Sequence, residues 1–463
     1  MFKRIISLLF SLSFINAQIA LPTFQAVHIP HNITSSSTVG PVIAGRYAQT
    51  GAILANGTVK FWGYNNYGQL GQGNTTRIGA GSGEMGDNLP AIDLGTGRTA
   101  TAIASGRLMA MALLDNGTVK AWGYNAQGQL GQGNTNIIGD GSGEMGDNLP
   151  AIDLGTGRTA TSIGAGLYHT GAILDNGTVK AWGYNAHGQL GQGNNSNIGD
   201  GSGEMGDNLP AIDLGTGRTA TAISLGAYIS VALLDNGTVK AWGYGNYGIV
   251  GQGNRQNIGD GSGEMGDNLA AIDLGTGRTA TAIAAGNFHI VALLDNGTVK
   301  AWGYNTRGSL GQGNLSHIGD DAGEMGDNLP AIDLGTGRTA TAIAAGAYHT
   351  IVILDNGTVK VWGYNIYGQL GQGNTNNMGD GAGEMGDNLS AIDLGTGRTA
   401  TAIHGGYYST IVRLDDGTIK VWGYNGQGQL GQGNTSNIGD GSGEMGDNLS
   451  AVDLSSSSDA TLE

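Results

Sequence analysis

Eight histidines are the side chains best suited to acid–base chemistry, and three of them, His169, His289 and His349, occupy the same position in a repeated segment. A general base needs an oriented partner and a nucleophile within hydrogen-bond reach. No such group accompanies these histidines in the sequence, and we expect the backbone to satisfy their ring nitrogens. The chain has no cysteine, which excludes thiol catalysis and cysteine zinc sites. The sequence therefore predicts a protein that is not an enzyme and has no cofactor.

A recurring acidic loop is a candidate for binding a divalent cation. In one copy, Asp140, Ser142 and Glu144 place oxygen atoms at the first, third and fifth positions, as a calcium-binding loop does. Met145 takes the sixth position, where such a loop needs glycine, and no bidentate glutamate follows six residues later. The first copy of the loop has Ala80 instead of the aspartate. We expect a solvated turn here and no metal site.

A glycine-rich loop, with Gly123, Gly128 and Gly131, also recurs along the chain. A phosphate-binding loop would need a helix N-terminus directly after it, and no helical pattern follows. Tight turns between closely packed elements are therefore the favoured interpretation. Trp122, just before this loop, is expected in the core. Lys120 lies two residues earlier and is expected to lay its stem along the indole, with a modest cation–π contribution.

The elements that must position these residues follow a fixed period. All seven tryptophans are evenly spaced, at positions 62, 122, 182, 242, 302, 362 and 422. Nearly the same segment surrounds each tryptophan. A fixed period of about 60 residues indicates one supersecondary unit copied along the chain. Seven such units form one predicted body, which covers positions 40–459.

Each unit is predicted to hold four short antiparallel strands, which in the second unit are residues 101–104, 109–114, 118–122 and 150–154. Asn116-Gly117 between two of these runs is a strong hairpin signal. Without helical periodicity, a β-propeller and an open solenoid are the two possible architectures. We expect an all-β, seven-bladed β-propeller, because radial closure protects sheet edges and a solenoid would need distinct capping repeats.

The repeated segment carries a family resemblance. Residues 113–124, followed by Gly-Gln-Leu-Gly-Gln-Gly-Asn at 128–134, resemble the repeat of the regulator of chromosome condensation family. A partial Gly-x-x-His-Thr motif at 166–170 adds to this resemblance, which extends over all seven units. The family fold is a seven-bladed propeller, in agreement with the periodicity. The motif histidine is replaced in four copies, by Gln49, Met109, Ile229 and Ser409.

Charge and the first residues indicate where the protein acts. The net charge of −16 disfavours nucleic acids and anionic membranes as partners. Residues 1–17 are predicted to be a signal peptide, with a basic Lys3-Arg4 start, an apolar stretch and a mature start at Gln18. The apolar stretch is too short to span a bilayer, so we expect a secreted protein with no membrane span. Residues 18–39 are an N-terminal segment that is a candidate for completing ring closure, and residues 460–463 form a tail.

The seven copies differ mainly in three short windows, which in the second unit are residues 107–109, 126–127 and 135–137. Copies that are otherwise nearly identical change where loops reach solvent. Binding energy at interfaces concentrates in tyrosine, tryptophan and arginine. The candidate binding residues are therefore the aromatic and basic members of these windows: Tyr67, Arg77, Tyr168, Tyr228, Phe288, Arg307, Tyr348, Tyr367 and Tyr408.

Two interpretations of this set remain open. Tyr168 and its equivalents share one position in the repeat, and are either packed between blades or exposed on a recognition rim. Tyr67, Arg77, Arg307 and Tyr367 favour the rim. Under a third interpretation, the variation is drift without function.

For function, the sequence favours a secreted, monomeric, non-enzymatic interaction module whose variable loops bind a protein or a glycan. The family resemblance implies an alternative, a guanine-nucleotide exchange factor for the GTPase Ran that docks on chromatin. The acidic charge and the predicted signal peptide oppose that alternative. A further alternative is an enzyme-inhibitory propeller, because similar propellers include a β-lactamase-inhibitory protein.

Overall fold

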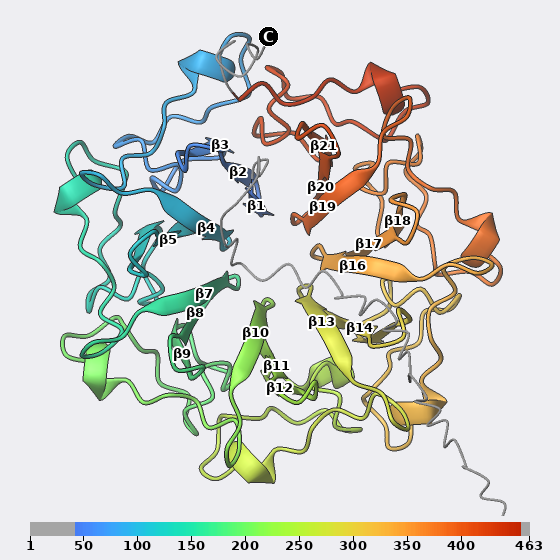
Figure 1. Cartoon of the computed structure of the whole chain (residues 1–463), viewed down its shortest axis with the longest axis horizontal. Helices are drawn as coiled ribbons and strands as arrows, with labels where there is room; N and C mark the ends of the chain where they lie inside the picture. Colours follow the sequence, from blue (N-terminus) through green and yellow to red (C-terminus); the bar gives the residue numbers. More distant parts are fainter. Residues whose placement is uncertain (1–41, 455–463) are drawn as a thin grey trace, which may run out of the picture.

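Seven three-stranded antiparallel sheets stand around a central axis (Figure 1). The computed structural model describes residues 42–454. In every sheet the strands follow one another in sequence order, with the first strand innermost. The predicted all-β, seven-bladed propeller is therefore confirmed. The predicted signal peptide, the predicted N-terminal segment and the predicted tail at residues 460–463 lie outside the described residues.

The seven inner strands are β1 Val42–Arg46, β4 Ala100–Ser105, β7 Ala160–Ala165, β10 Ala220–Leu225, β13 Ala280–Ala285, β16 Ala340–Ala345 and β19 Ala400–Gly405. The middle strands are β2 Gln49–Ile53, β5 Met109–Leu114, β8 His169–Leu174, β11 Ile229–Leu234, β14 His289–Leu294, β17 His349–Leu354 and β20 Ser409–Leu414. The outer strands are β3 Val59–Gly63, β6 Val119–Gly123, β9 Val179–Gly183, β12 Val239–Gly243, β15 Val299–Gly303, β18 Val359–Gly363 and β21 Ile419–Gly423.

The described helices are short 3-10 turns in the long loops: η1 Gly86–Asn88, η2 Gly146–Asn148, η3 Gly206–Asn208, η4 Asn246–Gly248, η5 Gly266–Asn268, η6 Gly326–Asn328, η7 Gly386–Asn388 and η8 Gly446–Asn448. Within residues 42–454, no helix has the length and hydropathy needed to cross a membrane.

The fourth strand predicted for each blade is wrong. In the second repeat, residues 150–154 make one ladder-type bond, from the backbone N of Ile152 to the O of Val119 at 2.8 Å. Pro150 has no N–H to donate, and the Asp153 carboxylate instead accepts from the N of Gly155 at 2.9 Å. The segment then passes to the next blade, where the Leu154 carbonyl accepts from Lys180 Nζ at 3.0 Å.

The core lies between neighbouring blades, and the tryptophans are its largest members. Trp122 is fully buried, as predicted, and its indole Nε1 donates to the Gln69 carbonyl of the preceding repeat at 3.1 Å. It packs with Phe61, Leu70 and Ile103, which come from two successive repeats. Burying one large apolar side chain contributes about 1.5–3 kcal/mol, so each interface between blades supports the ring.

The repeated lysines also join successive repeats. The buried Lys120 Nζ donates to the Leu94 carbonyl at 3.0 Å and to the Gly146 carbonyl at 2.7 Å. Burial lowers the pKa of this ammonium group, and the nearby Asp147 carboxylate opposes that effect. The ammonium group therefore links two successive repeats by hydrogen bonds. These bonds to carbonyl groups take the place of the expected cation–π contact with Trp122.

The glycine-rich loops are tight turns, as predicted. Gly128 has a φ of +77°, and a Cβ there would lie 2.4 Å from the backbone N of Asp200 in the next repeat. A phosphate could not replace this contact without separating the two repeats.

The seventh repeat closes the ring on the first. Lys60 Nζ donates to the Leu454 carbonyl at 2.6 Å, and Trp62 Nε1 donates to the Gln429 carbonyl at 3.0 Å. Equivalent bonds join the neighbouring blades at each of the remaining junctions. We call this junction the seam. Residues 18–39, the candidate for completing closure, lie outside the described residues.

Candidate functional site: an aromatic face

The antiparallel strands place their turns at two opposite faces of the ring. At one face, the turn after each inner strand meets the residues after each outer strand, and Tyr124 N donates to the Leu108 carbonyl at 2.9 Å. At the other, the hairpin after each middle strand meets the start of the inner strand, and Asp115 N donates to the Thr99 carbonyl at 2.9 Å. We call these the aromatic face and the hairpin face.

All three variable windows reach the aromatic face. The first window includes the turn after the inner strand, and the second lies in the loop that follows the outer strand. The third window lies beside the second of a neighbouring repeat: Asn197 Nδ2 donates to Gln127 Oε1 at 2.9 Å. Likewise, the His317 ring lies 4.9 Å from the Tyr247 ring. Segments that are far apart in sequence therefore form one surface.

A belt of aromatic rings runs from blade to blade through the first window. Successive ring centroids lie between 6.2 and 6.4 Å apart along the series Tyr168, Tyr228, Phe288, Tyr348 and Tyr407. These side chains are all half-buried. Aromatic pairs in offset or edge-to-face geometry contribute about 0.5–1.5 kcal/mol beyond their burial, so the belt is a preformed surface rather than a set of loose side chains.

A second series of rings lies outside the belt, formed by residues that follow the outer strands. Close pairs in it are Tyr67–Tyr124 at 5.1 Å, Tyr247–Tyr304 at 5.0 Å and Tyr367–Tyr424 at 4.8 Å. Tyr247 has a φ of 64°, and Tyr47 in the belt turn of the first repeat has a φ of 57°. They are the two non-glycine residues with positive φ among residues 42–454. Both of these strained positions belong to the aromatic face.

The predicted residues that share one position in the repeat, Tyr168, Tyr228, Phe288, Tyr348 and Tyr408, are half-buried. They contact neighbouring rings along their sides and keep part of their surface open. The structure thus places them between the two interpretations left open by the sequence: they pack against one another, and they do so at the face of the ring.

Of the other four predicted residues, only the two arginines are more open. Tyr67 and Tyr367 are half-buried, whereas Arg77 and Arg307 are exposed. The Arg307 guanidinium lies 4.9 Å over the ring of Tyr364, so it is held against the face by a cation–π contact. A binding role for the nine residues stays a prediction.

Arg46 is a feature of this face that sequence reasoning missed. Its guanidinium reaches across the ring, where Nη1 donates to the Leu225 carbonyl at 2.8 Å and to the Ala165 carbonyl at 3.2 Å. Nη2 donates to Asn287 Oδ1 at 3.4 Å. Burial lowers the pKa of Arg46 to about 10, which leaves it charged at neutral pH. The available signal was that Arg46 replaces the glycine found in the other repeats, such as Gly106.

Arg107 adds a second positive charge near the axis. Its guanidinium lies 5.0 Å over the Tyr47 ring and 5.4 Å over the Tyr168 ring. It thereby bridges the gap in the belt at the second repeat, where Leu108 stands instead of an aromatic residue. The centre of the aromatic face thus has positive charge in a protein whose net charge is negative.

The three histidines that share one position in the repeat are buried, and each contacts the next blade. His169 Nε2 lies 3.1 Å from Ser230 Oγ, and His289 Nε2 lies 3.1 Å from Thr350 Oγ1. Burial lowers the pKa of His169 to about 3 and that of His289 to about 4. In addition to this hydroxyl of the next blade, backbone hydrogen bonding at Ile229 acts on the His169 ring and at Ser409 on the His349 ring, in line with the backbone partner expected from the sequence. Their environment favours the neutral ring, which serves packing rather than proton transfer.

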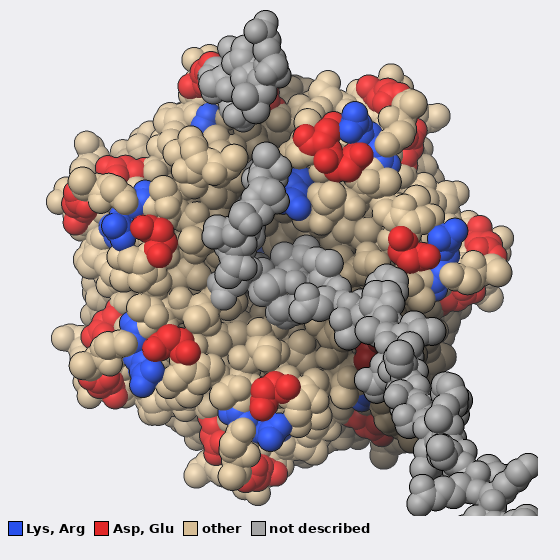
Figure 2. All heavy atoms as spheres, in the orientation of Figure 1, with Lys and Arg blue, Asp and Glu red and all other residues tan. Residues whose placement is uncertain are grey.

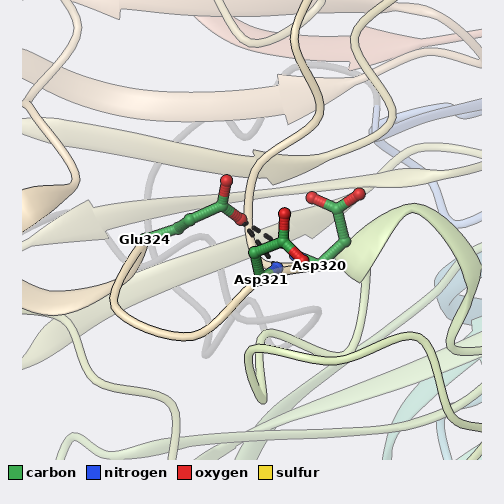
Figure 3. A group of neighbouring side chains, drawn as sticks. All are labelled: Asp320, Asp321 and Glu324. Atoms are coloured by element: carbon green, nitrogen blue, oxygen red, sulfur yellow. Dashed lines mark hydrogen bonds between the residues drawn. The ribbon is translucent and has the colours of Figure 1, made fainter.

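The acidic loops use their glutamate to close the turn. Glu144 Oε2 accepts from the backbone N of Gly139 at 2.7 Å and from that of Gly141 at 2.8 Å. This bonding agrees with the predicted turn. In the copy shown in Figure 3, Asp320, Asp321 and Glu324 approach one another, and the glutamate again accepts from backbone N–H groups.

Asp320 in that cluster already has a partner. Its buried carboxylate lies 2.8 Å from Arg255 Nη2 of the preceding repeat. The cluster is thus part of the contact between two repeats.

The hairpin face has a different character. On the face shown in Figure 2, acidic and basic side chains gather in small mixed clusters that recur from blade to blade near the outer edge. Arginine–aspartate pairs recur in the same way at the hairpins, for example Arg158–Asp175 at 3.2 Å and Arg278–Asp295 at 3.1 Å. These partly exposed pairs contribute about 0–1 kcal/mol each, and they neutralise one another locally.

Comparison with known proteins identifies the repeat. A family model described as the regulator of chromosome condensation (RCC1) repeat matches residues 100–129, 160–189, 220–249, 280–309 and 340–369. A second model of that description matches residues 176–233. The chain is built from RCC1 repeats. The resemblance seen in the sequence is therefore confirmed.

Two curated proteins illustrate how RCC1 repeats are used elsewhere. The human E3 ubiquitin-protein ligase HERC2 is 26% identical over 384 residues, which cover 83% of this chain and 7% of the ligase. The ultraviolet-B receptor UVR8 of Arabidopsis thaliana is 28% identical over 343 residues, which cover 73% of this chain and 68% of the receptor. This chain thus spans a small part of the first relative and about two thirds of the second.

Solved structures agree on the fold. Prp20p from Saccharomyces cerevisiae, described with its binding properties to Gsp1p and histones, has a TM-score of 0.61 at 16% identity, over 89% of both chains. Human WBSCR16 has a TM-score of 0.58 at 18% identity, over 80% of this chain and 86% of its own. At these identities the likeness concerns the architecture of RCC1 repeats.

Proposed function

We propose that this RCC1-repeat propeller is a secreted, monomeric, non-enzymatic interaction module whose aromatic face binds a protein or a glycan. The observation that carries this proposal is that the three variable windows come together on one face. Sequence drift without function would not be expected to gather aromatic rings and guanidinium groups on the same surface.

The chemistry of the aromatic face suits recognition. Tyrosine and arginine dominate the energetic centres of interfaces, because they offer large contact area and hydrogen-bonding ends at low entropic cost. Ring-to-ring contacts along the belt hold these side chains before a partner arrives, which reduces the ordering cost of binding. The strained backbone of Tyr47 and Tyr247 is a further sign, because such strain is concentrated at functional positions.

The proposal is tested by replacing Tyr67, Arg77, Arg307 and Tyr367 together with alanine. The mature protein, this variant and a matched hairpin-face variant are used to capture partners from extracellular fluid, with quantification by mass spectrometry. The hairpin-face variant carries Arg158→Ala, Arg278→Ala and Arg338→Ala. We expect the captured partner to be lost from the first variant and kept by the second. Equal capture by all three proteins would refute the role of the aromatic face.

The secretory part of the proposal has a separate test. Residues 1–17 are proposed to be removed during export, so N-terminal sequencing of the protein from its native source should begin at Gln18. A cytosolic pool that retains Met1 would contradict secretion and would leave the binding role of the aromatic face standing.

A further inference from the structure

The first repeat lacks one ring of the aromatic face, although the Tyr47 ring, 5.5 Å from the Tyr407 ring, continues the belt across the seam. The first repeat has Ala48 at the position that Tyr168 occupies in the third. The backbone of the two turns is equivalent there: the Ala48 carbonyl accepts from Tyr64 N at 2.8 Å, and the Tyr168 carbonyl accepts from Tyr184 N at 2.9 Å. The turn is therefore retained, while a methyl group stands at a position that is aromatic in the third repeat.

A cavity of about 340 Å³ opens beside Ala48. Small-molecule sites span roughly 300–1,000 Å³, so the cavity can hold one or two small rings. Its walls come from the first, sixth and seventh repeats, and they are Tyr47, Ala48, Tyr64, Tyr367, Tyr407, Tyr408, Tyr424 and Gln427. We call this cavity the seam pocket.

The walls of the seam pocket are held firmly by one another. The Tyr407 and Tyr408 rings meet edge to face at 4.5 Å, and the Tyr367 ring lies 5.0 Å from Tyr408 and 4.8 Å from Tyr424. The Tyr408 phenol is protonated at neutral pH, as an ordinary tyrosine is, and can donate a hydrogen bond. Burial raises its pKa further. The pocket therefore combines fixed aromatic surfaces with hydroxyl groups and the amide of Gln427.

This combination selects among possible ligands. The lining residues include no carboxylate, ammonium, guanidinium or imidazole group, and Arg107 stands 5.0 Å over the ring of one lining residue, Tyr47. A cationic ligand would be repelled by that charge, even though an aromatic pocket alone would suit it. A purely aromatic group would leave phenol and amide groups without partners, which costs free energy once water is displaced. A sugar ring has C–H groups for the aromatic surfaces and hydroxyls for the polar groups.

We propose that the seam pocket binds one ring of a neutral saccharide, beside Ala48. This inference rests on the proposed role of the aromatic face, and it narrows the ligand at one position of that face to a sugar ring. The remaining rings of the belt would then extend the contact along a longer chain.

The test uses the mature protein and five neutral oligosaccharides, built of glucose, N-acetylglucosamine, mannose, galactose or xylose. Binding is followed by saturation-transfer NMR and titration calorimetry at millimolar sugar. The variant Ala48→Tyr restores the missing ring and should fill the pocket. The control Leu108→Tyr makes the same kind of change at the equivalent position of the second repeat, outside the pocket. We expect one or more sugars to bind, with affinity at least tenfold weaker in Ala48→Tyr and unchanged in Leu108→Tyr.

Several outcomes would overturn the inference. These are no binding of any of the five sugars by the mature protein, equal binding by Ala48→Tyr and the mature protein, or displacement of bound sugar by a proline- or tyrosine-rich peptide at lower concentration. If Ala48→Tyr does not fold, Gln427→Ala must weaken sugar binding instead, with an unchanged melting curve. Failure of sugar binding while the aromatic face still captures a protein would remove this inference and leave the proposed function in place.

Discussion

At the scale of single residues, the positions of residues that recur in every repeat could be predicted from the sequence, whereas the contacts of a residue that occurs in one repeat could not. Trp122 and Gly128 were placed correctly because each recurs at a fixed position, and periodic residues in a closed ring are structural. Arg46 was not foreseen, since its partners Ala165, Leu225 and Asn287 lie two to four repeats away and meet only when the ring closes. Its replacement of a repeated glycine was the one sequence signal.

The buried histidines make acid stability a prediction at this scale. Burial lowers the pKa of His169 to about 3, that of His289 to about 4 and that of His349 to about 3. An unfolded histidine titrates near 6.5, so the unfolded state takes up more protons below that pH. The free energy of unfolding should be unaffected by these groups above pH 6.5 and should fall as pH drops toward 4. The loss is at most about 2–3 kcal/mol per histidine by pH 4.5.

The measurement is urea unfolding at pH 7.5 and pH 4.5. A triple His→Gln variant is the control, because Gln49 occupies this position in the first repeat and bonds the Met109 carbonyl at 2.7 Å. The variant should lose most of the dependence between these two pH values. If it is as sensitive to acid as the natural protein, the histidines are not responsible.

Alanine substitutions separate belt residues from exposed ones. Tyr168→Ala removes ring contacts with Tyr184 and Tyr228, at 6.2 and 6.4 Å, and should lower stability by about 1–2 kcal/mol. Arg307→Ala removes an exposed side chain and should change stability by less than about 0.5 kcal/mol. Thermal melts of the two variants provide the comparison. If Tyr168→Ala leaves the melting temperature unchanged, the belt is a solvated rim and its packing does not stabilise the fold.

At the scale of elements, the hairpin signal and the apolar runs gave three strands of every blade correctly. The fourth strand was predicted from residues 150–154, which alternate in the right way. A single ladder-type bond from Ile152 forms there, and Asp153 caps its own turn. The lack of a donor at Pro150 is not the cause, because the repeats with Ala270 and Ser390 at this position also form one such bond, from Ile272 and Ile392. The sequence could not show that this segment serves two blades at once, since that depends on the position of Lys180 in the next repeat.

The lysine ties make a prediction at the scale of elements. Lys120→Met keeps the apolar stem and leaves the Leu94 and Gly146 carbonyls without their donor. Unsatisfied buried polar groups cost about 1–3 kcal/mol, so the urea midpoint should fall accordingly. Arg158→Ala is the control, because its ion pair with Asp175 is partly exposed and contributes at most about 1 kcal/mol. Equal effects of the two substitutions would show that the lysines are not ties between repeats.

At the scale of the whole molecule, the regular spacing of the seven tryptophans was enough to predict a seven-bladed ring. What it could not predict is the difference between the two faces. Repeat copies are alike at the hairpin face, where local arginine–aspartate pairs recur, and they differ at the aromatic face, where side chains from separate repeats meet. The windows that vary were visible in the sequence, and their convergence needed the three-dimensional structure.

Closure of the ring leads to a prediction for a truncated chain. Ending the protein after the fourth repeat would remove the seam bonds of Lys60 and Trp62 and expose two blade edges. The fragment should aggregate, as judged by light scattering and size-exclusion chromatography. A four-repeat fragment that stays monomeric and unfolds cooperatively would favour the open solenoid that the sequence also allowed.

Photo-cross-linking from each face tests most directly whether the aromatic face is the binding surface. A photoreactive amino acid replaces the exposed Ile366 on the aromatic face in one protein, and the exposed Asn116 on the hairpin face in another. Irradiation in extracellular fluid should give a covalent adduct with a partner from position 366 and none from position 116. An adduct from position 116 alone would contradict the account and assign recognition to the hairpin face.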